Sequence, residues 1–141
     1  MDKRIVGTWR VVSVTAEDLE TGERRDAWGP QPEGYINYAP DGRMMVINVR
    51  GDRKKPTGRA PTREEAADLF ESMLAYAGTY TVEGDTVTHQ IDVSWNESWT
   101  GTRQVRIARF EGDRVHLSTK PGADLATGRP GVRIMTWEKV K

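Results

Sequence analysis

The sequence contains no cysteine, and this absence narrows the possible chemistry at once. A disulfide framework, a thiolate metal site and a cysteine nucleophile are all excluded. Histidine is scarce too, since only His89 and His116 occur. Neither lies at ligand spacing from a second metal-binding side chain, so we expect no metal site and no cofactor. A haem bound through His89 alone is the exception that the sequence leaves open.

The chain also lacks a net charge and a long apolar run. Lysine plus arginine and aspartate plus glutamate each number 21, so nothing favours nucleic acid or an anionic membrane as a partner. Only two apolar residues follow the basic pair near Met1, which is too few for a secretion signal, and no transmembrane segment is expected. We therefore expect a soluble, cytoplasmic protein, a monomer or homodimer, whose partner is a small molecule.

β-rich segments stand at both ends of the chain. Gly7-Thr8-Trp9 opens a β-branched run that extends to about Leu19, and Ile134 to Lys139 forms a second such segment. Pairing of the first strand with the last closes the sheet and leaves no unpaired edge. A chain of 141 residues suits one domain, so we expect a single barrel over residues 1–141.

Between these ends, short turns alternate with long loops. Asp41-Gly42, Gly84-Asp85 and Gly112-Asp113 each separate two β-rich runs and supply the positive φ that two-residue hairpin turns require. Counting strand directions places all three turns at the end where Trp9 starts, and the long loops at the other end. The fold class that we predict is mainly β: an antiparallel up-and-down barrel of about eight strands with an open, loop-lined mouth.

One helix interrupts the β pattern mid-chain, near the mouth of the barrel. Thr62 and Glu65 form a capping box, and Gly78 ends the segment. The residues between them form one apolar stripe: Ala66, Leu69, Phe70, Met73, Leu74 and Ala77. We expect this stripe to close one side of the mouth, as a fixed plug or as a moving lid.

Two-residue turns determine which residues lie opposite each other, because the pairs extend outward from the turn one by one. Around Gly84-Asp85, Tyr80 lies opposite His89, and the apolar pair Val82 and Val87 marks this face as inward. Counting around Gly84-Asp85 and Gly112-Asp113 predicts that the following side chains point into the barrel: Tyr80, His89, Gln104 and Arg106. Around Asp41-Gly42 the count leaves two choices, because both faces are similarly apolar, and we favour Tyr38 inward.

Several short motifs occur along the chain in a fixed order: Gly7-Thr8-Trp9, Pro32-x-Gly34-x-Ile36-x-Tyr38 with Asp41-Gly42-x-Met44, Tyr76-Ala77-Gly78-Thr79-Tyr80, His89, Trp99-x-Gly101 before Arg106, and Trp137-Glu138-Lys139. In order and spacing they resemble the bacterial and fungal lipocalin-like domain family. The resemblance implies a calycin-type barrel whose first tryptophan packs at the floor under a late basic residue, here Lys139 where an arginine is more usual. It also implies a role in secondary metabolism, since such domains occur in secondary-metabolite gene clusters and include barrels that bind or cyclise hydrophobic intermediates.

Each candidate site residue has a functional and a structural interpretation. His89 serves either as a general acid or base that titrates near neutrality, or as a core residue whose nitrogens are satisfied by Tyr80 or a carbonyl. Arg106 either holds an anionic ligand, because its inward face offers no carboxylate, or caps the floor. Trp95 and Trp99 either stack on a flat ligand or anchor a hairpin at the mouth.

The function that these residues favour is binding of a small, largely hydrophobic molecule, aromatic or polyketide-like and possibly anionic, in the barrel interior. The expected ligand-binding residues are Tyr38, Tyr80, His89, Ile91, Val93, Trp95, Trp99, Gln104, Arg106 and Phe70. The alternative is a cofactor-independent isomerase or cyclase with His89 as acid or base and with Arg106 and Tyr80 stabilising an oxyanion. A third possibility is a non-catalytic interaction module with a filled core.

Overall fold

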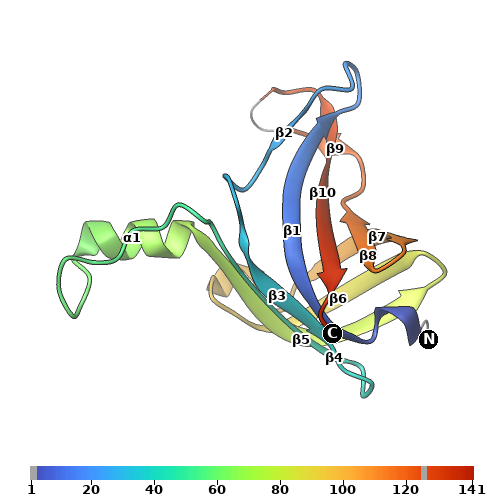
Figure 1. Ribbon diagram of the computed structural model, residues 1–141, viewed down its shortest axis with the longest axis horizontal. Coiled ribbons are helices and arrows are strands. Elements are labelled where there is room, and N and C mark those ends of the chain that lie inside the picture. Colours follow the sequence, from blue (N-terminus) through green and yellow to red (C-terminus); the bar gives the residue numbers. More distant parts are fainter. Residues whose placement is uncertain (1–2, 125–126) are drawn as a thin grey trace.

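A closed antiparallel barrel of eight strands forms the body of the protein in the computed structural model, which describes residues 3–124 and 127–141 (Figure 1). The barrel strands are β1 (Gly7–Asp18), β3 (Glu33–Tyr38), β4 (Arg43–Val49), β5 (Met73–Glu83), β6 (Thr86–Ser94), β7 (Arg103–Glu111), β8 (Arg114–Ser118) and β10 (Pro130–Lys139). Two short strands, β2 (Arg24–Asp26) and β9 (Gly122–Ala123), extend the sheet beside β1 and β10. The predicted fold class is confirmed.

Pairing of β1 with β10 closes the barrel, as the sequence predicted. The pairs run from Trp9 opposite Lys139 to Asp18 opposite Gly131. Because the first and last strands satisfy each other's backbone groups, the barrel has no free edge along these strands. The remaining strands follow in chain order around the wall, so neighbours in sequence are neighbours in space.

The floor of the barrel is built around Trp9. Its indole nitrogen donates a hydrogen bond to the carbonyl oxygen of Ile5 at 2.8 Å, within the short 3₁₀ turn η1 (Lys3–Ile5). The Lys139 ammonium lies 4.5 Å from the centre of the Trp9 ring and donates to the carbonyl oxygen of Val6. Gly7 lies beside it with φ +129°, a backbone conformation that favours glycine, and a Cβ there would lie 2.7 Å from Lys139 Nζ. Lys139 thus takes the place over the tryptophan that the family resemblance implied for a basic residue.

Two of the three hairpins have the predicted register, and the third does not. Tyr80 lies opposite His89, and Phe110 lies opposite Val115. In the hairpin between β3 and β4, however, the Ala39 amide donates to the Arg43 carbonyl across a three-residue loop, residues 40–42. The extra residue shifts the pairing by one, which turns a whole strand face over. The residues of β4 that face inward are therefore Met44, Val46 and Asn48, while Met45 and Ile47 face out.

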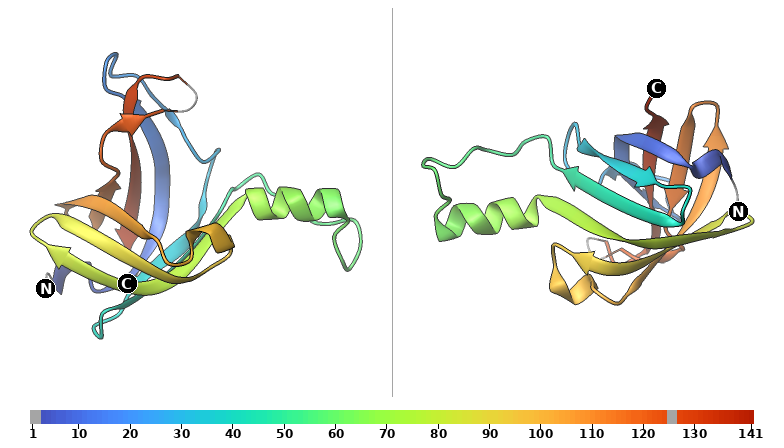
Figure 2. Two further views of the ribbon diagram at one scale, coloured as in Figure 1. Left: turned by 180° about the vertical axis from the view of Figure 1, so that it is seen from behind. Right: turned by 90° about the horizontal axis from the view of Figure 1, so that it is seen from below.

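The helix α1 (Arg63–Glu71) is shorter than predicted and lies elsewhere. The capping box is confirmed, since Thr62 Oγ1 accepts from the Glu65 amide at 3.1 Å and Glu65 Oε1 accepts from the Thr62 amide at 2.9 Å. Residues 73–78 belong to β5, where pairing with β4 satisfies their backbone and buries every second side chain. The helix buries none of its residues and projects away from the barrel (Figure 2), so the expectation of a plug or lid is wrong.

A β-bulge interrupts the pairing of β5 with β6. Gly78 lies opposite Ile91, but Ala77 lies opposite Val93, so Asp92 is an extra residue on β6. Gly78 permits the close approach, because a Cβ there would lie 1.7 Å from the Gln90 carbonyl oxygen. The bulge turns Val93 outward, where its side chain is 59% exposed, so its predicted inward position is wrong.

Candidate ligand-binding site

The interior of the barrel holds a small cavity of about 60 Å³. Its walls come from seven strands and combine apolar with polar side chains: Ile36, Val46, Asn48, Leu74, Tyr76, His89, Arg106, Leu117, Met135 and Trp137. A space of this size holds one or two water molecules and is smaller than typical small-molecule pockets, which measure about 300–1,000 Å³. Entry of a larger molecule requires displacement of flexible lining side chains such as Leu74 and Met135.

His89 lies at the centre of a buried hydrogen-bonded chain. Its Nε2 lies 2.6 Å from the Tyr38 hydroxyl, and its Nδ1 lies 2.6 Å from the Tyr76 hydroxyl. The histidine is only 2% exposed, and both tyrosines are buried. Because both ring nitrogens are engaged, neither presents a free lone pair to a metal, and the haem alternative does not fit this geometry.

Burial and charge keep His89 neutral. Removal from water, together with the positive charge of Arg106, lowers the pKa of His89 to about 3. The expectation that the imidazole titrates near neutrality is therefore wrong for the closed barrel. Burial also raises the pKa of Tyr76 to about 12 and that of Tyr38 well above its usual value. All three groups of the chain are uncharged at pH 7.

Arg106 brings a positive charge to the same cavity. Its guanidinium donates to the Gln104 side-chain oxygen at 3.2 Å and to the carbonyl oxygen of Val105 at 3.0 Å, and both acceptors are neutral. No carboxylate in residues 3–124 and 127–141 lies within ion-pair distance of it. Burial lowers the pKa of the guanidinium, yet an arginine stays protonated in proteins. The predicted inward positions of Gln104 and Arg106 bring them to one side of the cavity.

Tyr80 occupies a different place from the one expected. It is buried and lies opposite His89 in the sheet, but its hydroxyl donates to the carbonyl oxygen of Ala39 at 2.7 Å. Its ring packs edge-on against Tyr38, with 4.8 Å between the centroids. Tyr80 therefore packs against Tyr38 of the hydrogen-bonded chain and makes no hydrogen bond to His89. Tyr38 and Ile91 lie inside the barrel, as predicted.

Of the ten residues that line the cavity, only His89 and Arg106 were among the predicted binding residues, and the missed ones include two with polar groups, Tyr76 and Asn48. Tyr76 was assigned to the helix, although continuing the alternation of Val82, Tyr80 and Gly78 backward along β5 places it inward. Asn48 was missed because the β3–β4 register is shifted by one residue. Its Oδ1 is buried and has no hydrogen-bond partner among the residues that the structure describes.

An aromatic row connects the cavity with the outer surface. Trp99, in the 3₁₀ turn η2 (Glu97–Trp99), lies 5.9 Å from Tyr76 and 5.0 Å from Trp95, measured between ring centroids. Trp95 in turn lies 6.0 Å from Phe70 of α1 and donates to its carbonyl oxygen at 3.3 Å. Of the predicted binding residues, Trp99 thus lies beside the cavity wall, whereas Trp95 and Phe70 lie outside it.

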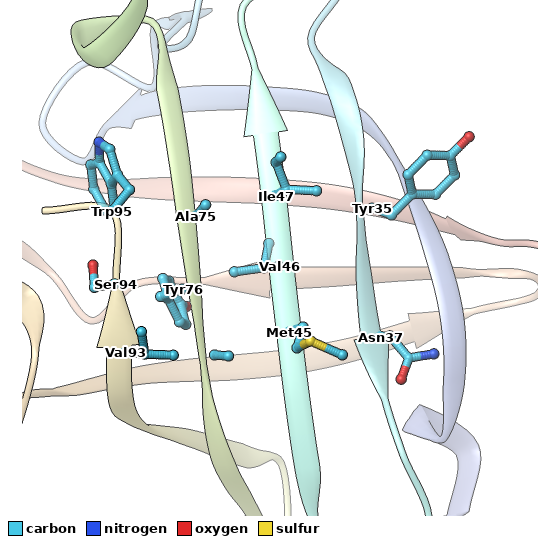
Figure 3. Close-up of a pocket in the computed structure, with 11 residues that line it drawn as sticks. Tyr35, Asn37, Met45, Val46, Ile47, Ala75, Tyr76, Val93, Ser94 and Trp95 are labelled. Carbon is cyan, nitrogen blue, oxygen red and sulfur yellow. The ribbon is translucent and has the colours of Figure 1, made fainter.

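A larger hollow lies on the outer face of the same strands. It measures about 540 Å³ and runs across β3, β4, β5 and β6 (Figure 3). Its lining consists of Tyr35, Asn37, Met45, Val46, Ile47, Ala75, Tyr76, Ala77, Val93, Ser94 and Trp95. The Asn37 amide already donates to Thr8 Oγ1 at 2.7 Å, and the Tyr35 hydroxyl accepts from Arg10 at 3.3 Å. We call this hollow the outer groove.

Comparison with protein families shows to which family the chain belongs. The model of the lipocalin-like domain family matches residues 6–140, almost the whole length. The chain belongs to this family. Among solved structures, a lipocalin-like protein from Bacteroides uniformis aligns with 97% of this chain and 99% of its own, at 9% identity and a TM-score of 0.50. An uncharacterized protein from Bacteroides eggerthii aligns with 96% and 99%, at 11% identity and a TM-score of 0.47.

One relative of this lipocalin-like domain has a functional name. The 4'-hydroxy-3'-methoxypropiophenone carrier protein of Aspergillus oryzae is 33% identical over 87 residues, which are 56% of this chain and 78% of the relative. Within the described residues, no helix is long and apolar enough to cross a membrane.

Proposed function

We propose that this lipocalin-like domain binds a small, largely apolar aromatic molecule in the barrel interior. The observation that carries the proposal is the surplus of buried hydrogen-bonding groups around the cavity. Asn48 Oδ1 has no partner, and Arg106 has only neutral ones. A core that serves stability alone keeps few such groups, because each costs about 1–3 kcal/mol. Oxygen atoms on an aromatic ligand would accept hydrogen bonds from Arg106 and from the side-chain amide of Asn48.

The relative from Aspergillus oryzae supports the same ligand class. Its name states that it carries an aryl ketone with a hydroxyl and a methoxy group. A molecule of this kind exceeds about 60 Å³, so binding here requires Leu74, Met135 or Trp99 to move toward the mouth. All three are only partly buried, whereas the tyrosines and His89 below them are fixed by hydrogen bonds.

Binding accounts for the interior better than proton transfer by His89. A base with a pKa of about 3 abstracts protons poorly at pH 7, and both of its nitrogens are already engaged. Cytoplasmic location, a role in secondary metabolism and a monomeric or homodimeric state remain predictions.

Calorimetric titration with 4'-hydroxy-3'-methoxypropiophenone tests the proposal. We expect saturable binding by the natural chain and roughly tenfold weaker binding by Asn48→Leu, which removes polar atoms from the cavity. Met45→Ala, on the outer groove, is the matched control and should bind as the natural chain does. Weakened binding in Met45→Ala together with unchanged binding in Asn48→Leu would place the ligand in the outer groove instead.

A further inference from the structure

The chain of Tyr38, His89 and Tyr76 has one hydrogen too many for its two hydrogen bonds. A neutral imidazole offers one N–H donor and one nitrogen acceptor. One tyrosine must therefore donate to His89, and the other must accept from it. The tyrosine that accepts keeps its own hydroxyl hydrogen, which makes no further hydrogen bond within the described part of the chain.

The position of the cavity decides which tyrosine keeps that hydrogen. Tyr76 lines the cavity, whereas Tyr38 is fully buried against Tyr80 and His89. A free hydrogen on Tyr38 would point into packed side chains, so Tyr38 donates to Nε2 and the Nδ1 hydrogen is donated to Tyr76. The Tyr76 hydroxyl then directs its hydrogen toward the cavity.

Arg106 adds a second donor with a full positive charge. Its present partners, Gln104 and a backbone carbonyl, accept hydrogen bonds from it but do not neutralise its charge. A partly buried cation is stabilised by an anion held close to it in a medium of low polarity. The cavity therefore offers a hydroxyl donor and a guanidinium to one oxygen atom, which favours a negatively charged oxygen.

We propose that the molecule bound in the interior is an ionised phenol or enol whose oxygen accepts hydrogen bonds from Tyr76 and Arg106. The inference rests on the proposed function and specifies the chemical form of its ligand. When a phenol binds, its O–H bond breaks and the proton passes to the buffer, while the electron pair stays on the bound oxygen. His89 does not take that proton, because its pKa of about 3 keeps it neutral.

A pH titration of binding separates the ligand's ionisation from that of the protein. The ionisable groups that line the cavity are Tyr76 from β5, His89 from β6 and Arg106 from β7, and Tyr38 from β3 lies behind them. The pKa of His89 is about 3, burial raises the pKa of Tyr76 to about 12 and that of Tyr38 well above its usual value, and Arg106 stays protonated, so we expect none of them to titrate between pH 5 and 7. Below the pKa of the free phenol, we expect the dissociation constant of 4'-hydroxy-3'-methoxypropiophenone to fall tenfold for each unit of rising pH.

Absorption spectroscopy provides the direct test, because a phenolate absorbs at longer wavelength than its phenol. At pH 6 we expect the natural chain to produce the phenolate band of the propiophenone. Arg106→Gln should abolish the band and weaken binding at least tenfold. The non-ionisable control is 3',4'-dimethoxypropiophenone, which should bind without a band and independently of pH, and whose binding Arg106→Gln should weaken much less than that of the propiophenone. Binding of this control also shows that the variant is folded.

The outcomes distinguish this inference from the proposed function. Binding of the propiophenone with no phenolate band and a pH-independent dissociation constant would overturn the inference and leave the proposed function standing. Failure of both compounds to bind the natural chain would overturn both.

Discussion

The interior cavity and the outer groove lie on opposite faces of the same strands, β4 to β6, and differ in almost every respect. The groove is nine times larger by volume, at about 540 Å³ against about 60 Å³, and is lined mainly by apolar side chains. The cavity is small but contains a neutral histidine, a tyrosine hydroxyl, an amide and a guanidinium. Apolar area supplies affinity, whereas a few placed polar groups fix orientation. The hollow with the greater volume is thus not the one with the greater capacity for selective recognition.

The β-bulge beside Gly78 sets which side chains of β6 face outward, so its disruption should have the largest effect. In Gly78→Ala the new Cβ would lie 1.7 Å from the Gln90 carbonyl, a contact that only a backbone shift can relieve. We expect a loss of about 4 kcal/mol of unfolding free energy in urea denaturation. Gly84→Ala, where a Cβ meets nothing within 4 Å but φ is +61°, is the control and should cost about 1–2 kcal/mol. Equal losses in the two variants would contradict the assigned role of the bulge.

Removal of His89 should have the next largest effect. His89→Ala leaves a void and deprives the Tyr38 and Tyr76 hydroxyls of their partner. We expect a loss of about 3 kcal/mol in the same denaturation assay. Met45→Ala on the outer groove, at a side chain that is 63% exposed, should change stability by less than about 0.5 kcal/mol. A similar loss of unfolding free energy in the two variants would show that the hydrogen-bonded chain of Tyr38, His89 and Tyr76 contributes no more to stability than exposed apolar contacts.

The pH dependence of stability tests the environment of His89. The unfolded chain takes up a proton on this histidine below a pKa of about 6.5, whereas the folded chain resists protonation until about pH 3. Its contribution is therefore fully present above pH 6.5 and is lost as the pH falls toward 3. We expect this residue to lower the unfolding free energy by about 2 kcal/mol between pH 7 and pH 5. In His89→Gln the fall in unfolding free energy between pH 7 and pH 5 should be smaller by this amount. An equal fall in the variant and the natural chain would show that the native imidazole is accessible to protons.

Asn48→Leu should have the smallest effect on stability, and an effect of the opposite sign. Replacing an amide whose buried oxygen has no partner by an apolar side chain of similar size removes an unpaired polar group. We expect a gain of about 1 kcal/mol in thermal or urea unfolding, accompanied by the weaker ligand binding described above. A loss of stability would indicate that Asn48 holds Gly34 and β3 in place, since a Cβ at Gly34 would lie 2.4 Å from Asn48 Oδ1.

Sequence reasoning predicted the part of the site that follows from two-residue turns. Gly84-Asp85 propagates a fixed register, so the inward positions of Tyr80, His89, Gln104 and Arg106 could be counted from it and its neighbours. The errors arise where one residue is added. The three-residue loop after Tyr38 and the bulge beside Gly78 each reverse the faces beyond them, and neither leaves a clear signal in the local composition.

The error in the predicted boundary between the helix and the following strand had a different cause. Residues 66–77 satisfy a helical stripe, yet Leu74 and Tyr76 also alternate with the inward residues of β5. Tertiary burial decided the competition, because as a strand the segment places Tyr76 in the core and pairs with β4. The partnership of Tyr76 with His89 depends on this long-range pairing and could not be seen from local periodicity.

The projecting helix α1 also lies between two neighbouring strands of the barrel, β4 and β5. The excursion over residues 50–72 has hydrogen bonds of its own, such as those from Arg53 to Ser72 and to the Leu69 carbonyl, and the helix buries none of its residues. A cut within it would leave β4 at the end of one fragment and β5 near the start of the other, still joined along a seven-residue ladder. The chain is therefore suited to complementation from two halves, with each half bringing one of the tyrosines that flank His89.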